Sequence, residues 1–244
     1  MELWGITDSG KVRRQNQDVF KTLYDEDKDI AVLVVCDGMG GANAGNVASA
    51  IAADTFMHYM GRYVEDIGSI DETAKEMTNA VMSANTAVYE KSAHEDEYAG
   101  MGTTLTAAIS TADGEVAVNI GDSRVYHVTS KSITQITRDH SVIEDMLARG
   151  DLTKDEARVH PNKHIITRAI GTSRVEKPDV FFINLNSGEH LLLCSDGLSN
   201  VVLDSEMLFA LQNSAAVREC CENLVEMALS RGAPDNVTAV VFRK

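Results

Sequence analysis

The sequence lacks the features that mark membrane, disulfide-rich and nucleic-acid-binding proteins. Only four cysteines and three prolines occur among its 244 residues, which excludes a scaffold held together by disulfides. No apolar run reaches the ~18 residues of a membrane-spanning helix. The 22 basic residues are outnumbered by 37 acidic ones, a formal net charge of −15, so the chain lacks the positive charge that general binding to phosphate backbones requires. We therefore expect a globular protein that binds neither membrane nor nucleic acid.

The beginning of the chain also lacks a basic region followed by an apolar stretch, so no secretion signal is visible there. The cysteines match no zinc-binding spacing, and reduced thiols are expected. Cys36 and Cys194 lie inside apolar runs, where inert packing thiols are expected rather than the nucleophile of a cysteine phosphatase. No docking domain is visible, and we expect a cytoplasmic monomer.

The pattern of apolar residues predicts one mixed domain over residues 1–244, because no linker rich in Pro, Gly or Ser divides the chain. Continuous or alternating apolar runs predict strands, and apolar residues at helical spacing predict helices. This order is not a regular alternation of strand and helix, so it favours an α+β fold of antiparallel sheets with helices outside. The predicted strands are 30–36, 103–109, 116–120, 133–136, 180–185, 191–194 and 237–242, and the predicted helices are 44–59, 71–91, a short one from 204, and 217–228.

Residues 139–171 form a different kind of segment. They are polar, hold three of the seven histidines and have weak strand signals, although short helices are indicated over 141–149 and 153–158. We interpret this segment as a flap-like lid.

The informative feature of the sequence is the position of aspartate. Asp37, Asp122 and Asp196 come at the ends of apolar runs, whereas Asp18 and Asp235 come just before such runs. If these strand ends share one edge of the sheets, five carboxylates converge there. Convergent carboxylates repel one another unless a divalent cation lies between them, and an all-oxygen ligand set favours Mg²⁺ or Mn²⁺ over Zn²⁺.

Two further residues complete the candidate site. The glycine after Asp37 lets the backbone come close to a cation, so the Gly38 carbonyl is a candidate ligand. Arg13 lies a few residues before Asp18 and is the candidate anion binder, because a guanidinium grips two phosphate oxygens at once.

Each motif alone has a more ordinary explanation. An Asp-Gly pair is usually a hairpin turn, and Asp235-Asn236 after a proline suits a turn as well. Asp122-Ser123 could cap a helix or form a turn. Arg13 could be a solvated surface arginine, which is our interpretation of Arg14.

Taken together, the motifs resemble those of the metal-dependent protein phosphatases of type 2C, in their compact bacterial form. The resemblance extends over nearly the whole chain and rests on eight segments in the order of the family: GKVRRQNQD at 10–18, VVCDGMGG at 34–41, GMGTTL at 100–105, NIGDSRVY at 119–126, TRDHS at 137–141, HPNKHIITRAIG at 160–171, LLLCSDGL at 191–198 and APDNVTAVV at 233–241.

This resemblance implies a four-layer sandwich of two packed antiparallel β-sheets flanked by α-helices. It implies a signalling enzyme, a protein-serine/threonine phosphatase that hydrolyses phosphoserine and phosphothreonine in proteins with a water held between two metal ions. The implied cofactors are two tightly bound Mn²⁺ or Mg²⁺ ions and a weaker third. The implied partners are phosphorylated proteins, namely a cognate Ser/Thr kinase and its targets.

The resemblance also assigns metal ligands. Asp37 would bridge two metals, and the Gly38 carbonyl would bind the second. Asp196 and Asp235 would complete the first metal. Asp18 would act on the second metal through water.

Three further roles follow from the same resemblance. Asp122, together with Asp196, matches the position of the third metal. Arg13 matches the arginine that contacts the substrate phosphate. Asn236 would orient the last ligand.

The chain departs from the family pattern near this site. Gln17 stands where an acidic residue is often found, Ala42 where bacterial relatives often have histidine, and Asn46 where they often have glutamate. Proton donation to the leaving oxygen would then fall to metal-bound water or to a flap residue. His160 is a candidate, although a structural histidine before Pro161 is the favoured interpretation, and His164 has no assigned role.

Two alternatives stay open. A non-catalytic phosphoprotein-binding relative would usually lose ligand carboxylates, so the presence of Asp37, Asp196 and Asp235 argues against it. A phosphatase with one dedicated substrate, in a partner-switching or sporulation pathway, is not excluded by the sequence.

Overall fold

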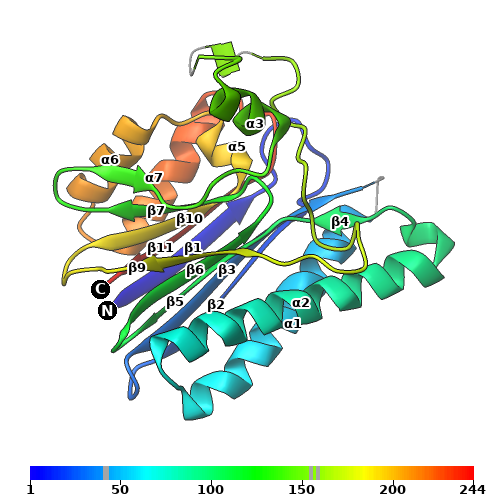
Figure 1. Ribbon diagram of the computed structural model, residues 1–244. Coiled ribbons are helices and arrows are strands. Elements are labelled where there is room, and N and C mark those ends of the chain that lie inside the picture. Colours follow the sequence, from blue (N-terminus) through cyan, green and yellow to red (C-terminus); the bar gives the residue numbers. More distant parts are fainter. Residues whose placement is uncertain (41–43, 154–155, 158–159) are drawn as a thin grey trace.

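The computed structural model of the protein describes residues 1–40, 44–153, 156–157 and 160–244. Figure 1 shows two sheets packed face to face, with α1 and α2 on one outer side and α6 and α7 on the other. The strands are β1 (Glu2–Asp8), β2 (Asp18–Asp25), β3 (Ile30–Met39), β4 (Gly102–Thr103), β5 (Leu105–Thr111), β6 (Gly114–Ile120), β7 (Arg124–Val128), β8 (Ile133–Gln135), β9 (Asp179–Ile183), β10 (His190–Cys194) and β11 (Val237–Arg243). The α-helices are α1 (Gly45–Tyr63), α2 (Ile70–His94), α3 (Val142–Arg149), α5 (Asp196–Ser199), α6 (Asp204–Asn213) and α7 (Val217–Ser230), and two short 3₁₀ helices are η1 (Val64–Asp66) and η2 (Asp96–Tyr98).

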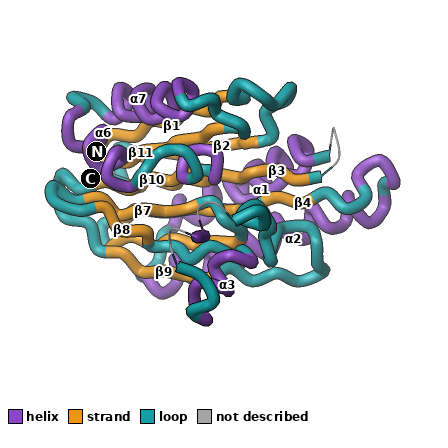
Figure 2. The backbone as a smooth tube through the Cα atoms, turned by 90° about the horizontal axis from the view of Figure 1, so that it is seen from above, coloured by secondary structure: helices purple, strands orange, loops and turns teal. Residues whose placement is uncertain are grey.

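Each sheet combines hairpins of consecutive strands with strands that are distant in sequence. One has five strands in the order β1-β11-β10-β7-β8, and the other follows β2-β3-β5-β6-β9 with β4 paired to β3. All of these pairings are antiparallel. Figure 2 shows the first sheet from above, with its strands side by side in that order. The α+β sandwich of two antiparallel sheets with outer helices is therefore confirmed.

Three apolar layers alternate with the sheets and helices. The central strand β3 shows why its whole run is apolar: Val32 and Val34 pack toward α1 and α2, whereas Leu33 and Val35 pack between the sheets. Successive side chains of a strand point to opposite faces, so a strand covered on both faces needs apolar residues at every position. A third layer lies between the five-stranded sheet and α6 and α7.

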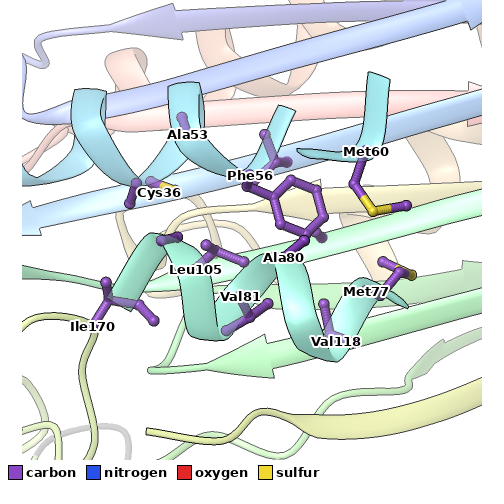
Figure 3. Packing of buried hydrophobic residues seen from close by; sticks show 14 of the residues in the cluster. Cys36, Ala53, Phe56, Met60, Met77, Ala80, Val81, Leu105, Val118 and Ile170 are labelled. Atoms are coloured by element: carbon purple, nitrogen blue, oxygen red, sulfur yellow. The ribbon is translucent and has the colours of Figure 1, made fainter. Parts of the chain in front are cut away.

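Figure 3 shows the layer under α1 and α2. Phe56 and Met60 from α1 meet Met77 and Val81 from α2 above the six-stranded sheet. These four side chains are fully buried, which anchors both helices by apolar burial. The start of α2 is fixed locally by a capping box, in which Ser69 and Glu72 satisfy each other's backbone N–H groups.

The strand boundaries differ from the prediction where pairing rather than apolarity decides them. The predicted strand over 30–36 continues to Met39, because Gly38 and Met39 pair with β4. The predicted strand over 103–109 is split into β4 and β5. Three strands had no prediction, β1, β2 and β7, because each of them mixes polar with apolar residues.

The flap-like segment rises from one edge of the sheets, next to α5 (Figure 1). The predicted helix over 141–149 is present as α3, capped by Ser141 and ended by Gly150 in the left-handed conformation. The predicted helix over 153–158 falls partly outside the described residues. Among the described residues, no helix is long and apolar enough to cross a membrane.

All four cysteines are buried and unbridged. Burial raises the pKa of the Cys194 thiol to about 12 and that of Cys36 further. These thiols are therefore protonated at neutral pH, as expected for packing residues.

Candidate active site

The sandwich brings the predicted site residues to one end of the two sheets. A cavity of about 800 Å³ is lined by four of the five aspartates, together with Gly38, Arg13 and Asn236. Asp18 does not line this cavity. It lies directly opposite Asp37 in the β2–β3 pairing, where it is buried behind the cavity wall. Residues that span most of the chain thus meet in one place, as the strand-end interpretation predicts. The four lining aspartates are Asp37, Asp122, Asp196 and Asp235.

Neither of the two Asp-Gly pairs at the site forms a hairpin turn. Asp37 and Gly38 lie inside β3, and a Cβ atom on Gly38 would collide with the Gly45 carbonyl oxygen. Asp196 and Gly197 open α5, and a Cβ atom on Gly197 would collide with the Asn236 carbonyl oxygen. Each glycine therefore permits a close backbone approach that brings a site aspartate against another part of the site.

The backbone around Asp37 is held firmly by two threonines. Its N–H donates to Thr104 Oγ1 at 2.9 Å, and its carbonyl accepts from Thr103 Oγ1 at 2.9 Å. The side chain of Asp196 accepts from Asn200 Nδ2 at 2.9 Å, one turn further along the chain. These bonds hold the backbone of Asp37 and the side chain of Asp196 in place. Both residues line the cavity.

Asp18 is fixed by residues that sequence reasoning did not single out. Ser195 Oγ and Thr238 Oγ1 both donate to its Oδ2 at 2.6 Å. Both side chains are fully buried. Ser195 directly precedes Asp196, and Thr238 lies shortly after Asp235. A buried hydroxyl next to a ligand motif is the signal that could have found them.

Electrostatics in the cavity favour a cation. Burial raises the pKa of Asp18 to about 7, against the lowering effect of its two hydroxyl donors. Burial, then the neighbouring Asp18 and Asp196 charges, raise the pKa of Asp37 well above its usual range. Burial and Asp196 do the same to the pKa of Asp122. Each carboxyl is thus hard to ionise unless positive charge joins it.

Two buried carboxylate oxygens have no hydrogen-bond partner among the described residues, Asp18 Oδ1 and Asp196 Oδ1. An ionised carboxylate only accepts hydrogen bonds, so a buried and unpartnered oxygen suits a cation. This observation and the all-oxygen donor set fit a hard divalent metal. Within the described ranges, no three Cys, His, Asp or Glu side chains are already gathered as a metal group, so the cavity offers separate carboxylates rather than one finished cluster.

An arginine and a histidine contact the carboxylates instead. Arg13 NH2 donates to Asp235 Oδ2 at 2.7 Å, and more than half of the arginine side chain is exposed. His164 from the flap lies 3.7 Å from Asp196 Oδ2, and that carboxylate raises the pKa of the imidazole. His164 lines the cavity, but His160 is not among the described lining residues.

Asn236 holds the loop that carries Arg13. Its Oδ1 accepts from the Gln17 N–H at 2.8 Å, and its Nδ2 donates to the carbonyls of Ser9 and Gln15 at 2.9 and 3.0 Å. The side chain therefore ties the loop of residues 9–17 to the start of β11.

The departures from the family pattern are partly visible. Gln17 lies against Gly45, where an added Cβ atom would collide with its side chain. Asn46 has a buried Oδ1 without a hydrogen-bond partner among the described residues. Ala42 lies outside the described residues.

Comparisons with known proteins agree with this geometry. The family model described as Protein phosphatase 2C matches residues 11–239. The serine/threonine phosphatase stp of Listeria innocua is 32% identical over 238 residues, which cover 98% of this chain and 94% of the relative. The structure of the serine/threonine phosphatase Stp1 from Staphylococcus aureus superimposes with a TM-score of 0.92 at 34% identity, covering 100% of this chain and 94% of that one. The catalytic domain of the phosphatase PstP, solved in complex with two manganese ions, gives a TM-score of 0.84 at 34% identity, with 98% and 96% covered.

Proposed function

The chain belongs to the protein phosphatase 2C family, and from this premise we propose that it hydrolyses phosphoserine and phosphothreonine in proteins with the help of divalent metal ions. The observation that carries the proposal is the convergence of Asp37, Asp122, Asp196 and Asp235 on one cavity. The buried carboxylate oxygens without hydrogen-bond partners supply negative charge for a metal ion. The guanidinium of Arg13 supplies positive charge for a phosphate ester.

The proposed metal ligands are the side chains of Asp37, Asp196 and Asp235 and the carbonyl of Gly38, with Asp18 acting through water. Asp122 and Asp196 are the proposed ligands of a third and weaker ion. Mn²⁺ or Mg²⁺ would activate a water molecule for attack on phosphorus and neutralise charge on the phosphoryl oxygens. The PstP structure with its two manganese ions supports this choice of metal.

The chain's own residues position these charges. Thr103 and Thr104 fix the backbone of Asp37, and the hydroxyls of Ser195 and Thr238 hold one oxygen of Asp18 so that the other stays free. Asp235, to which Arg13 donates, would hold a metal ion. The exposed guanidinium beside it would bind two oxygens of the substrate phosphate, a charge-assisted pair that neutral donors do not match.

The remaining parts of the proposal are coarser. Phosphorylated proteins are the substrates, and a cognate Ser/Thr kinase is the enzyme that this phosphatase opposes. One catalytic domain over residues 1–244 with a flap at 139–171 is part of the same proposal. The monomeric and cytoplasmic state expected from the sequence stays a prediction.

The direct test is an assay on phosphoserine and phosphothreonine peptides, with Mn²⁺ and with excess chelator. We expect turnover with Mn²⁺, complete loss with chelator, recovery when Mn²⁺ is restored, and little turnover of a phosphotyrosine peptide. Calorimetric titration with Mn²⁺ separates this outcome from a non-catalytic relative, which would bind metal weakly or not at all. Turnover that survives complete removal of metal would overturn the proposal.

Replacing Arg13 by alanine should weaken the use of substrate more than the chemical step. Hydrogen bonds to charged groups contribute about 1.5–3 kcal/mol, which corresponds to a loss in kcat/KM on the order of 10- to 100-fold, mostly through KM. Arg14→Ala is the matched control, because Arg14 is exposed next to it and lines no part of the cavity. Equal kinetics for the two variants would contradict the role given to Arg13.

A further inference from the structure

A second cavity of about 760 Å³ adjoins the site. The two cavities share five lining residues, Asp122, Lys163, Asp196, Asn200 and Val201. The second cavity is lined by residues of α3 in the flap, of α5 and of the start of α6. Figure 1 shows α3 and α5 together at one edge of the sheets. A polypeptide that leaves the first cavity past this shared border therefore enters the second.

The charged residues of the second cavity largely neutralise one another. Arg124 NH2 pairs with Asp139 Oδ2 at 2.7 Å, and Gln135 Nε2 donates to Asp139 Oδ1 at 2.8 Å. Arg138 Nε pairs with Glu144 Oε1 at 3.2 Å. Acidic groups exceed basic ones along the lining, so the cavity does not suit a second phosphate group.

One part of the lining, beside these pairs and other polar residues, is apolar. Ile143 and Leu147, four residues apart on α3, present one face of the helix to the cavity. Val201, Val202 and Leu203 line the opposite side, ahead of α6. Leu203 is 44% exposed although it is a large apolar side chain. An apolar wall of this kind is typical of a place where a partner's apolar side chain is buried.

We infer that this second cavity, with the wall formed by Ile143, Leu147 and Val201–Leu203, receives an apolar side chain of the substrate protein that lies close in sequence to the phosphorylated residue. The inference rests on the proposed function, since the phosphorylated residue must occupy the first cavity. The shared border favours the substrate polypeptide over a second copy of this chain or a small molecule, because neither of those needs to reach the first cavity.

The test compares phosphothreonine peptides that carry leucine or serine at each flanking position in turn. Burying one leucine side chain is expected to raise kcat/KM by about tenfold at one or more of these positions. A peptide with a photoreactive leucine analogue at the preferred position should crosslink to residues 143–147 or 201–203, as mapped by mass spectrometry.

Two substitutions check that the wall itself produces the preference. In Leu203→Ser and in Leu147→Gln, the ratio of kcat/KM between the leucine and serine peptides should fall toward one. Leu203 is exposed and serine suits the start of a helix, so the first variant should fold normally. Phe209→Ser is the matched control: Phe209 is 66% exposed on α6 and lines neither cavity, so the ratio should be retained.

The outcomes distinguish failure of this inference from failure of the proposed function. A ratio near one in the parent protein, or an unchanged ratio in both wall variants, would overturn the inference. If the parent protein still hydrolyses p-nitrophenyl phosphate with Mn²⁺, the proposed function would survive that result. If the parent protein hydrolyses neither peptide nor p-nitrophenyl phosphate, both proposals fall.

Discussion

Asp37→Asn is expected to abolish phosphopeptide turnover, with kcat reduced by about 10³-fold or more. Asp37 has the most crowded position in the site, because Asp18, Asp196, Asp122 and Asp235 all raise its pKa after burial has done so. Asparagine keeps the shape of the side chain and removes the charge. Metal-derived charge stabilisation contributes several kcal/mol, and each ~1.4 kcal/mol is a factor of ten in rate.

The same substitution should make the metal-free protein more stable. Without a cation, Asp37 is a buried carboxyl among like charges, and asparagine relieves both the burial of charge and the repulsion. Thermal unfolding in chelator should therefore show a higher midpoint for Asp37→Asn than for the parent protein. Asp113→Asn is the control, because Asp113 is exposed in the turn between β5 and β6, and it should change neither activity nor midpoint. Normal activity in Asp37→Asn would show that the site is misplaced.

Mn²⁺ should stabilise the folded protein strongly, and more so at pH 7.5 than at pH 5. A ligand present at 100 times its Kd adds about 2.7 kcal/mol, which for a chain of this size raises the unfolding midpoint by roughly 5–10 °C. The metal replaces protons on the carboxyls, so at acidic pH it must compete with them. Scanning calorimetry with Mn²⁺ and with chelator at both pH values measures the difference.

The sign of the pH effect follows from the raised pKa values. Asp18 titrates near 7 in the folded metal-free protein, against an ordinary value of 3.8, and the pKa values of Asp37 and Asp122 are raised as well. Between pH 3.8 and about pH 7, the folded state binds more protons than the unfolded state. The metal-free protein therefore loses stability as the pH rises toward 7 and above. His140 acts in the opposite direction, because burial lowers its pKa below 6.5, so its contribution is lost as the pH falls.

Burial lowers the pKa of His190 in the same way. Three raised carboxyls outweigh two lowered histidines, so the net trend should follow the carboxyls. In Asp37→Asn the pH dependence should flatten. A Mn²⁺ effect that is the same at pH 5 and pH 7.5, or that is undiminished in Asp37→Asn, would contradict this account of the cavity.

The strands without a prediction, such as β7 and β1, show where local pattern fails. β7 carries Arg124 at its start, and Tyr126 is fully buried within it. Arg124 is tolerated there because Asp139, beyond the neighbouring strand β8, pairs with it and Tyr126 Oη accepts from it at 3.0 Å. The alternation within β7 alone does not reveal the Asp139 partner. In β1, half-exposed residues on both faces leave no clear alternation to detect.

Much of the fold and of the candidate site can be predicted from the sequence alone. Strand β3, helices α1 and α2 and the aspartates at strand ends follow from periodicity, because burial on one face or two is recorded in the spacing of apolar residues. The order of the motifs placed the chain in its family. Only the tertiary structure decided that Asp18 faces Asp37, that Arg13 reaches Asp235, and that a second cavity adjoins the first. Some of those relations join residues near opposite ends of the chain, such as Arg13 and Asp235. They depend on strand pairing and sheet packing, which no local pattern encodes.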